Sequence, residues 1–169
     1  MPTPPDTRPK FPEVGDERAL LDNFLDHHRA TLLWKCAGLT DEQLKTRSVS
    51  SSALTLLGLV RHITEVERWW FFRFLDRTAD PIYFTEQRQN DDFDALDSAP
   101  PAEVFARWDA EVDRIRQDIA AVPLDAEFTD RRGTPYSLRW VYIHMIEEYA
   151  RHNGHADLIR EGIDGVTGE

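Results

Sequence analysis

Residues 137–160, SLRWVYIHMIEEYARHNGHADLIR, carry the pattern that decides the fold of this chain. Apolar residues recur there every three or four positions, which is the spacing of one buried face of an α-helix. A carboxylate and an imidazole, Glu148 and His152, stand on consecutive turns of that face. Because burying an unpaired charge costs several kcal/mol, Glu148 needs a compensating partner. The stretch therefore predicts a long helix, over about residues 137–162, with a polar pair on its apolar face.

Three other stretches repeat the helical period, over about residues 16–39, 52–75 and 100–122. Asp16 and the serines at 50–52 can cap the first two helices, and proline suits the first turn of the third. We find no convincing strand, internal repeat or second domain in the sequence. Four helices of about 20 residues each predict an all-α fold, a four-helix bundle.

A long connection joins the second and third predicted helices. Residues 76–101 are rich in Asp and Pro and show no sustained period. Loops of that length are uncommon in compact domains and are often functional.

Size, charge and cysteine content limit the possible functions. The 169 residues suit one domain, over residues 16–169, preceded by a proline-rich tail, residues 1–15, that we expect to be disordered. The net charge of -11 repels phosphate backbones, so nucleic acid is not an expected partner. The sequence has neither a signal-peptide pattern nor an apolar run near the roughly 20 residues that span a membrane. The single cysteine, Cys36, excludes an internal disulfide and points to the cytoplasm.

The second predicted helix also has a polar residue on its apolar face. His62 interrupts a stripe that otherwise holds Leu59, Val66 and Trp69. Glu148 and His152 are four residues apart and so lie side by side on one helix face. Metal sites in helical bundles are built from inward-pointing Glu and His on facing helices. The spacing therefore favours a divalent metal held by His62, Glu148 and His152.

Spacing alone leaves alternatives open. His62 by itself could be a hydrogen-bonded core residue, and the pairs 144/148 and 152/155 compete with 148/152. One straight helix cannot aim His144, Glu148 and His152 at one ion, because each step of four residues drifts by about 40°. Glu148 could instead pair with an arginine, the candidates being Arg61, Arg68 and Arg151.

Three motifs resemble the DinB-like superfamily, in its mini-circle or mycothiol-dependent branch. They are residues 137–160, quoted above, 54–71, LTLLGLVRHITEVERWWF, and 35–44, KCAGLTDEQL. The resemblance implies an up-down-down-up four-helix bundle with a metal at one end of its interior. The positions that match the usual ligands of this family are His62, Glu148 and His152.

Glutamate at the middle ligand position departs from the commonest pattern of the family, which has histidine there. It is the pattern of the mycothiol-dependent maleylpyruvate isomerase, whose zinc is held by two histidines and a glutamate. His144 and His155 are then candidates to orient a ligand or to contact substrate, or else are polar residues at the rim of the bundle. The isomerase has an additional C-terminal domain and this chain ends at Glu169, so we do not expect isomerase activity.

The predicted chemistry follows from an open coordination position. Three protein ligands leave such a position, as in catalytic zinc sites, where a bound thiol or water loses a proton more easily. The resemblance favours a thiol S-transferase that joins mycothiol, or another small thiol, to an electrophile. The alternatives are a metal-dependent hydrolase and a non-enzymatic metal- or ligand-binding stress-response bundle. Zinc is the expected metal, with nickel, iron or manganese also compatible.

Two further expectations concern the rest of the chain. Cys36 has apolar neighbours and is expected to be a buried, inert thiol. Five aromatic residues crowd the end of the second helix, more than one face can bury: Trp69, Trp70, Phe71, Phe72 and Phe74. We expect core packing with an exposed remainder, ahead of a substrate pocket or dimer interface. The resemblance implies a homodimer.

Overall fold

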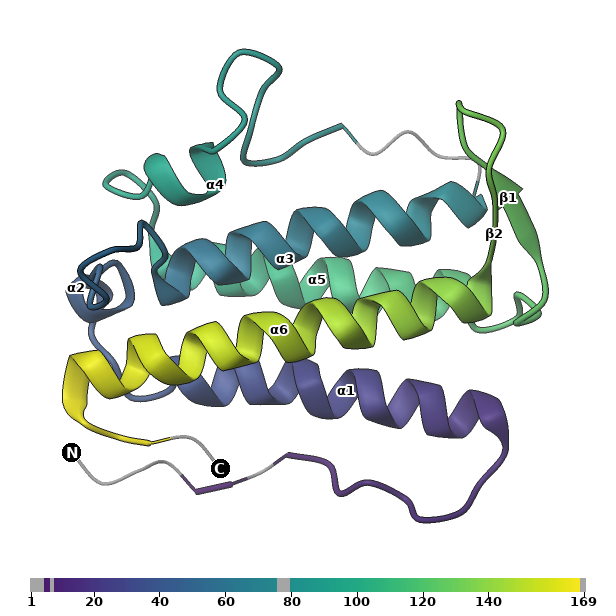
Figure 1. Cartoon of the computed structure of the whole chain (residues 1–169), viewed down its shortest axis with the longest axis horizontal. Coiled ribbons are helices and arrows are strands. Elements are labelled where there is room, and N and C mark those ends of the chain that lie inside the picture. The colour runs from purple at the N-terminus through teal and green to yellow at the C-terminus, as the bar shows by residue number, and fades with distance from the viewer. Residues whose placement is uncertain (1–4, 7, 76–79, 168–169) are drawn as a thin grey trace.

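The computed structural model describes residues 5–6, 8–75 and 80–167. Its four long helices are α1 (Glu17–Cys36), α3 (Leu56–Phe71), α5 (Pro101–Ile119) and α6 (Leu138–Asp164). Helices α1 and α6 run in one direction and α3 and α5 in the other, as Figure 1 shows. The predicted up-down-down-up four-helix bundle is therefore confirmed.

The ends of the helices follow their capping residues. Asp16 accepts a hydrogen bond from the Ala19 amide at 2.9 Å and begins α1 as predicted. Helix α3 begins later than predicted, because Thr55 caps it and the serines at 50–52 do not. Helix α6 begins after the cap Ser137 and ends where Gly165 adopts a left-handed conformation, φ 78°.

A small β-hairpin corrects the prediction that the chain has no strand. Strands β1 (Glu127–Thr129) and β2 (Pro135–Ser137) pair antiparallel and lead directly into α6. The turn between them is closed by Asp130, which accepts hydrogen bonds from the amides of Arg132 and Thr134. Strands of three residues are too short to produce a visible alternation in the sequence.

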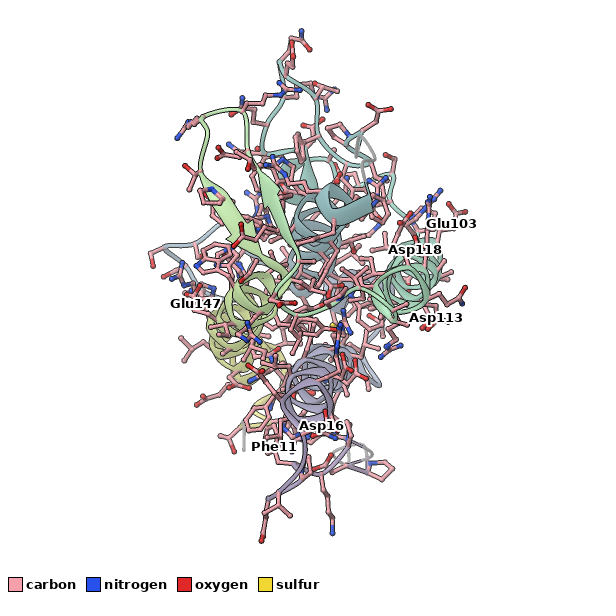
Figure 2. The ribbon with its side chains drawn as sticks, turned by 90° about the vertical axis from the view of Figure 1, so that its right-hand side faces the viewer. Phe11, Asp16, Glu103, Asp113, Asp118 and Glu147 are labelled. Carbon is pink, nitrogen blue, oxygen red and sulfur yellow. The ribbon has the colours of Figure 1, made fainter. Side chains whose placement is uncertain are left out.

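The four helices form a diamond when the bundle is viewed end-on, as in Figure 2. Helix α6 packs mainly against α1 and α3, and α3 packs also against α5. Helices α1 and α5 have few contacts with each other, so the bundle is open between them. The outer side of α5 carries Glu103, Asp113 and Asp118, which Figure 2 labels.

A buried polar network joins all four long helices at the centre of the core. Arg29 of α1 donates two hydrogen bonds to one oxygen of Glu67 on α3, at 2.9 and 2.6 Å. Tyr149 of α6 donates to Glu67 and accepts from the indole N–H of Trp108 on α5 at 3.1 Å. Burial raises the pKa of the Glu67 carboxyl, and the positive charge of Arg29 opposes that shift. Each buried charge or dipole in this network thus has a partner.

The long connection between α3 and α5 is tied back onto α3. Arg61 donates to the carbonyl of Ala95 at 2.7 Å, and Arg68 donates to that of Asp80 at 2.9 Å. Between them, Glu65 accepts from two backbone amides, those of residues 82 and 83. Within the described part of this connection lies one helical turn, α4 (Asp91–Asp94). The first four residues of the predicted connection, 76–79, lie outside the described residues.

Two short helical segments complete the described elements, α2 (Asp41–Leu44) and η1 (Phe72–Leu75). In the N-terminal segment, the ring of Phe11 lies 4.3 Å from that of Phe24 and 4.0 Å from that of His27, both on α1. The disordered tail over residues 1–15 stays a prediction, and its residues 1–4 and 7 lie outside the described residues.

The buried pair of Arg29 and Glu67 predicts a large stability effect. Replacing Glu67 with alanine leaves the Arg29 guanidinium buried without its main partner, so Glu67→Ala should lower the free energy of unfolding by about 3–5 kcal/mol. Urea unfolding followed by circular dichroism measures this loss. The matched control is Glu17→Ala, which removes an exposed pair with Arg139 and should leave the midpoint nearly unchanged. A wild-type midpoint for Glu67→Ala would contradict the assigned role.

Candidate functional site

The predicted residues His62 and His152 come together on the outer side of the contact between α3 and α6. Their ring centroids are 4.9 Å apart. Glu148 lies one turn before His152, with its Oε2 3.5 Å from His152 Nε2. The three side chains are partly buried, with 30% of His62, 18% of Glu148 and 12% of His152 exposed. The structure thus places all three on neighbouring surfaces of two antiparallel helices.

Glu148 lies at the edge of the core rather than within its apolar stripe. Tyr149 takes the buried position on this turn and is fully buried, as are Met145 before it and Ala156 after it. The prediction that Glu148 occupies the buried face is therefore wrong, because the next residue, Tyr149, occupies it. Since the carboxylate keeps some contact with solvent, its burial costs less than the sequence pattern implied.

The arginines weighed as partners of Glu148 bond elsewhere. Arg61 and Arg68 hold the long connection, and Arg151 pairs with Glu147 one turn before it. The contacts described for Glu148 are to histidines on both sides: His144 Nε2 lies 3.5 Å from its Oε1, and His152 Nε2 lies 3.5 Å from its Oε2. Each carboxylate oxygen therefore faces a different imidazole.

His62 has a buried carboxylate partner that the sequence did not reveal. Its Nδ1 lies 2.9 Å from Oδ2 of Asp92 in α4, and Asp92 is 5% exposed. The sequence offered little signal for it, because Asp92 stands in the run 90–94, NDDFD, among two other aspartates. Its burial depends on how the connection folds back, which local pattern does not determine.

His152 is held in the neutral form by its surroundings. Burial, followed by the neighbouring charges of His62, His155 and Arg151, lowers the pKa of His152 to about 4. Its Nδ1 lies 3.4 Å from Nδ1 of His155. Its Nε2 lies 3.5 Å from Glu148 Oε2, so these two atoms are the ones that a metal ion between the side chains would bind.

A second set of potential ligands lies on the same helix. Among the described residues, His144, Glu147 and Glu148 form a group whose ligand atoms lie within 4.8 Å of one another. The ligand atoms of His62, Glu148 and His152 are not gathered to that distance in the structure. The two sets share Glu148, and they differ in burial, because Glu147 has a side chain 47% exposed and paired with Arg151.

Aromatic rings surround His144 and separate it from the hairpin. Trp140 stacks on the His144 ring at 4.8 Å, and Trp70 approaches it edge-on at 4.8 Å. Tyr136 of β2 and Phe128 of β1 contact Trp70 in turn. Trp70, one of the crowded aromatic residues, therefore packs in this cluster. Phe71 and Phe72 are buried and Trp69 is exposed, which agrees with the expected core packing and exposed remainder.

The donor set around Glu148 fits a divalent metal ion. Two imidazoles and a carboxylate are ligands that zinc, nickel, iron and manganese all accept. His62 and His152 each have Nδ1 beside a side chain outside the proposed ligand set, Asp92 for His62 and His155 for His152. This is the arrangement in which outer partners orient metal-binding histidines.

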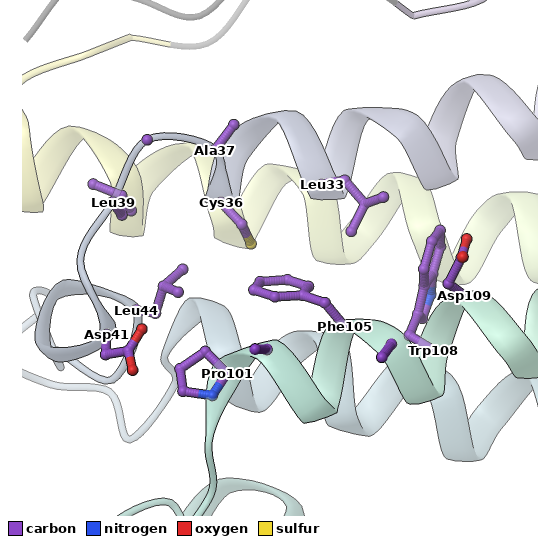
Figure 3. Close-up of a pocket in the computed structure, with 13 residues that line it drawn as sticks. Leu33, Cys36, Ala37, Leu39, Asp41, Leu44, Pro101, Phe105, Trp108 and Asp109 are labelled. Atoms are coloured by element: carbon purple, nitrogen blue, oxygen red, sulfur yellow. The ribbon is translucent and has the colours of Figure 1, made fainter.

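A groove lies elsewhere on the bundle, in the opening between α1 and α5. It has a volume of about 620 Å³ and an apolar lining that includes Leu33, Leu39 and Phe105 (Figure 3). None of the five predicted site residues lines it. The thiol of Cys36 points into it, yet Cys36 is 5% exposed and burial raises the pKa of its thiol to about 12.

Comparison with known proteins identifies the family. A family model described as mycothiol-S-transferase matches residues 20–165, which include all four long helices except the first turn of α1. The chain belongs to the mycothiol-S-transferase family, a DinB-like, mycothiol-dependent branch, and this membership implies a transferase with mycothiol as its thiol substrate. Comparison with curated proteins and with solved structures found no match. No described helix is long and apolar enough to cross a membrane.

Burial makes Cys36 a poor nucleophile, which can be measured directly. Since the thiolate is the reactive form, a thiol with a pKa near 12 should react with iodoacetamide very slowly in the folded protein and rapidly in urea. Mass spectrometry of alkylated protein over time checks this. Cys36→Ala should retain transferase activity, and fast alkylation of the native protein would contradict the assignment of Cys36 as inert.

Proposed function

We propose that this protein is a metal-dependent S-transferase that joins the sulfur of mycothiol to an electrophile. The observation that carries the proposal is the family match over residues 20–165. The meeting of His62 on α3 with His152 and Glu148 on α6 supports the position of the metal. Zinc is the metal we propose, on the basis of the two-histidine, one-carboxylate set.

Burial favours His62, Glu148 and His152 over the group on α6 alone. A metal held by His144, Glu147 and Glu148 would use the half-exposed Glu147, whose carboxylate already pairs with Arg151. The proposed set draws ligands from two helices, each of its histidines has an outer partner, and all three side chains are at least 70% buried. The terminal torsions of histidine and glutamate side chains are broad, so we propose that rotation about them gathers the three ligand atoms around the ion.

A metal held by His62, Glu148 and His152 would supply a positive charge that lowers the pKa of a thiol beside it, so that thiolate would be present at neutral pH. The residues of the chain prepare for this in three ways. His152 stays neutral, so it does not repel a cation. Glu148 contributes negative charge between His144 and His152. The ring cluster of Trp70, Tyr136 and Trp140 provides an apolar border beside His144.

In the reaction, the thiol loses its proton to solvent, and the thiolate sulfur uses a lone pair to form a bond to the electrophilic carbon. In a substitution, the leaving group departs with the electrons of the broken bond; in an addition, the product carbon takes up a proton. Water activated at the same site would produce hydrolysis instead, without any thiol. The thiol requirement therefore separates the proposed transferase from the hydrolase alternative.

Metal content tests the ligand assignment. Purified wild-type protein should carry close to one equivalent of metal, and His62→Ala and His152→Ala should each lose most of it, because two remaining ligands bind weakly. Elemental analysis after desalting measures the content. Glu147→Gln is the matched control, since it neutralises a carboxylate on the same helix that the proposed set does not use.

The two candidate groups give opposite results in this series. If His144, Glu147 and Glu148 hold the metal, Glu147→Gln loses it and His62→Ala retains it. Full metal content in both His62→Ala and His152→Ala would refute the proposed ligands.

Conjugation of mycothiol to a generic electrophile tests the activity. The rate should fall to the uncatalysed level after chelation, return when zinc is added back, and be low for His152→Ala. Chromatographic measurement of the conjugate, with ester and amide substrates in a parallel arm without thiol, separates transfer from hydrolysis. A chelator-resistant rate with mycothiol would contradict the metal requirement.

The expected homodimer also remains a proposal. Light scattering coupled to size-exclusion chromatography distinguishes it from a monomer of 19.6 kDa.

A further inference from the structure

We propose that Asp92 is a positioning residue, which fixes His62 so that its Nε2 is the metal-binding atom. The inference rests on the proposed metal site and goes beyond it, because it assigns a role to the long connection between α3 and α5. Its basis is the 2.9 Å contact between Asp92 Oδ2 and His62 Nδ1.

The carboxylate of Asp92 is held on both sides. Its Oδ1 accepts a hydrogen bond from the Phe93 amide at 3.1 Å, which leaves Oδ2 facing His62. Asp92 is buried, and in a buried setting a charged acceptor without its donor is costly. His62 therefore stabilises Asp92 as well as being oriented by it.

The contact determines which nitrogen of His62 carries the proton. A carboxylate only accepts hydrogen bonds, so Nδ1 must donate, and in the neutral ring Nε2 then keeps its lone pair. A free imidazole divides between two tautomers and several ring orientations. Asp92 fixes one tautomer and one ring orientation before the metal binds, which reduces the entropy that His62 loses on binding.

The turn that carries Asp92 is itself anchored on α3 around His62. The ring of Phe93 lies over Gly58, one turn before His62, and a Cβ on Gly58 would come within 2.6 Å of Phe93 Cδ1. The Phe93 ring also packs on the His62 ring, with centroids 5.3 Å apart. Arg61 closes the other end of the turn through the Ala95 carbonyl. These three contacts hold α4 against α3, and the hydrogen bond of Asp92 with His62 is a fourth, directed toward the site.

Nitrogen-15 NMR of the imidazoles in metal-free protein tests the inference directly. In wild-type protein at alkaline pH, where the imidazole is neutral, His62 should be protonated at Nδ1 alone. Asp92→Ala should show both tautomers and bind zinc roughly 10- to 100-fold more weakly, measured by competition with a chelating dye. Asp92→Asn, whose amide oxygen can still accept from Nδ1, should retain the tautomer and lose less affinity.

The control is Asp94→Asn, a neutral substitution in the same turn at a side chain 57% exposed, which should change neither measurement. Protonation of His62 at Nε2 in the wild-type protein would overturn the inference, whether or not the variants fold. An unchanged tautomer or zinc affinity in folded Asp92→Ala would overturn it too. A wild-type protein that binds no zinc but shows the Nδ1 tautomer would instead refute the proposed metal site.

Discussion

The buried contact of Arg29 with Glu67 constrains the rest of this bundle. Apolar helix faces tolerate sliding and rotation at small cost, because many packings bury similar areas. A buried guanidinium and a buried carboxylate do not, since each is strongly destabilised without the other. Tyr149 bonds to Glu67, and Trp108 bonds to Tyr149, so these contacts tie all four long helices together at one height in the core.

The position of this network along the helices determines where the candidate site forms. Helices α3 and α6 are antiparallel, so moving back along α3 from Glu67 corresponds to moving forward along α6 from Tyr149. His62 lies five residues before Glu67 and His152 three residues after Tyr149, and their rings meet. The network thus brings His62 of α3 and His152 of α6 together, about one helical turn away from Glu67 and Tyr149. It also turns Tyr149 inward, which leaves Glu148 at the solvent edge, where a carboxylate is tolerated and reachable.

The long helices could be predicted from the sequence because their signal is local and repeated. Three local signals agree with the observed helices: the helical period of residues 137–160, the N-cap Asp16 of α1, and the proline in the first turn of α5. The hairpin could not, since three-residue strands depend on the rings of Phe128 and Tyr136 packing on Trp70. The meeting of His62 with His152 was predictable from two interrupted stripes. Asp92 was not, because only the path of a connection distinguishes it from Asp91 and Asp94.

The topology gives a physical reason why a connection takes part in the site at all. Helices α3 and α5 are parallel neighbours, so the chain must return over the length of the bundle between them. A connection of that length would be costly to order unless something held it. Polar side chains of α3 hold it, through Arg61, Glu65 and Arg68. Once the chain is held along α3, it passes beside the residues next to these anchors, and His62 adjoins Arg61. The polar contact at His62 is therefore a consequence of the up-down-down-up order, which brings a carboxylate from a distant segment against a metal-binding candidate.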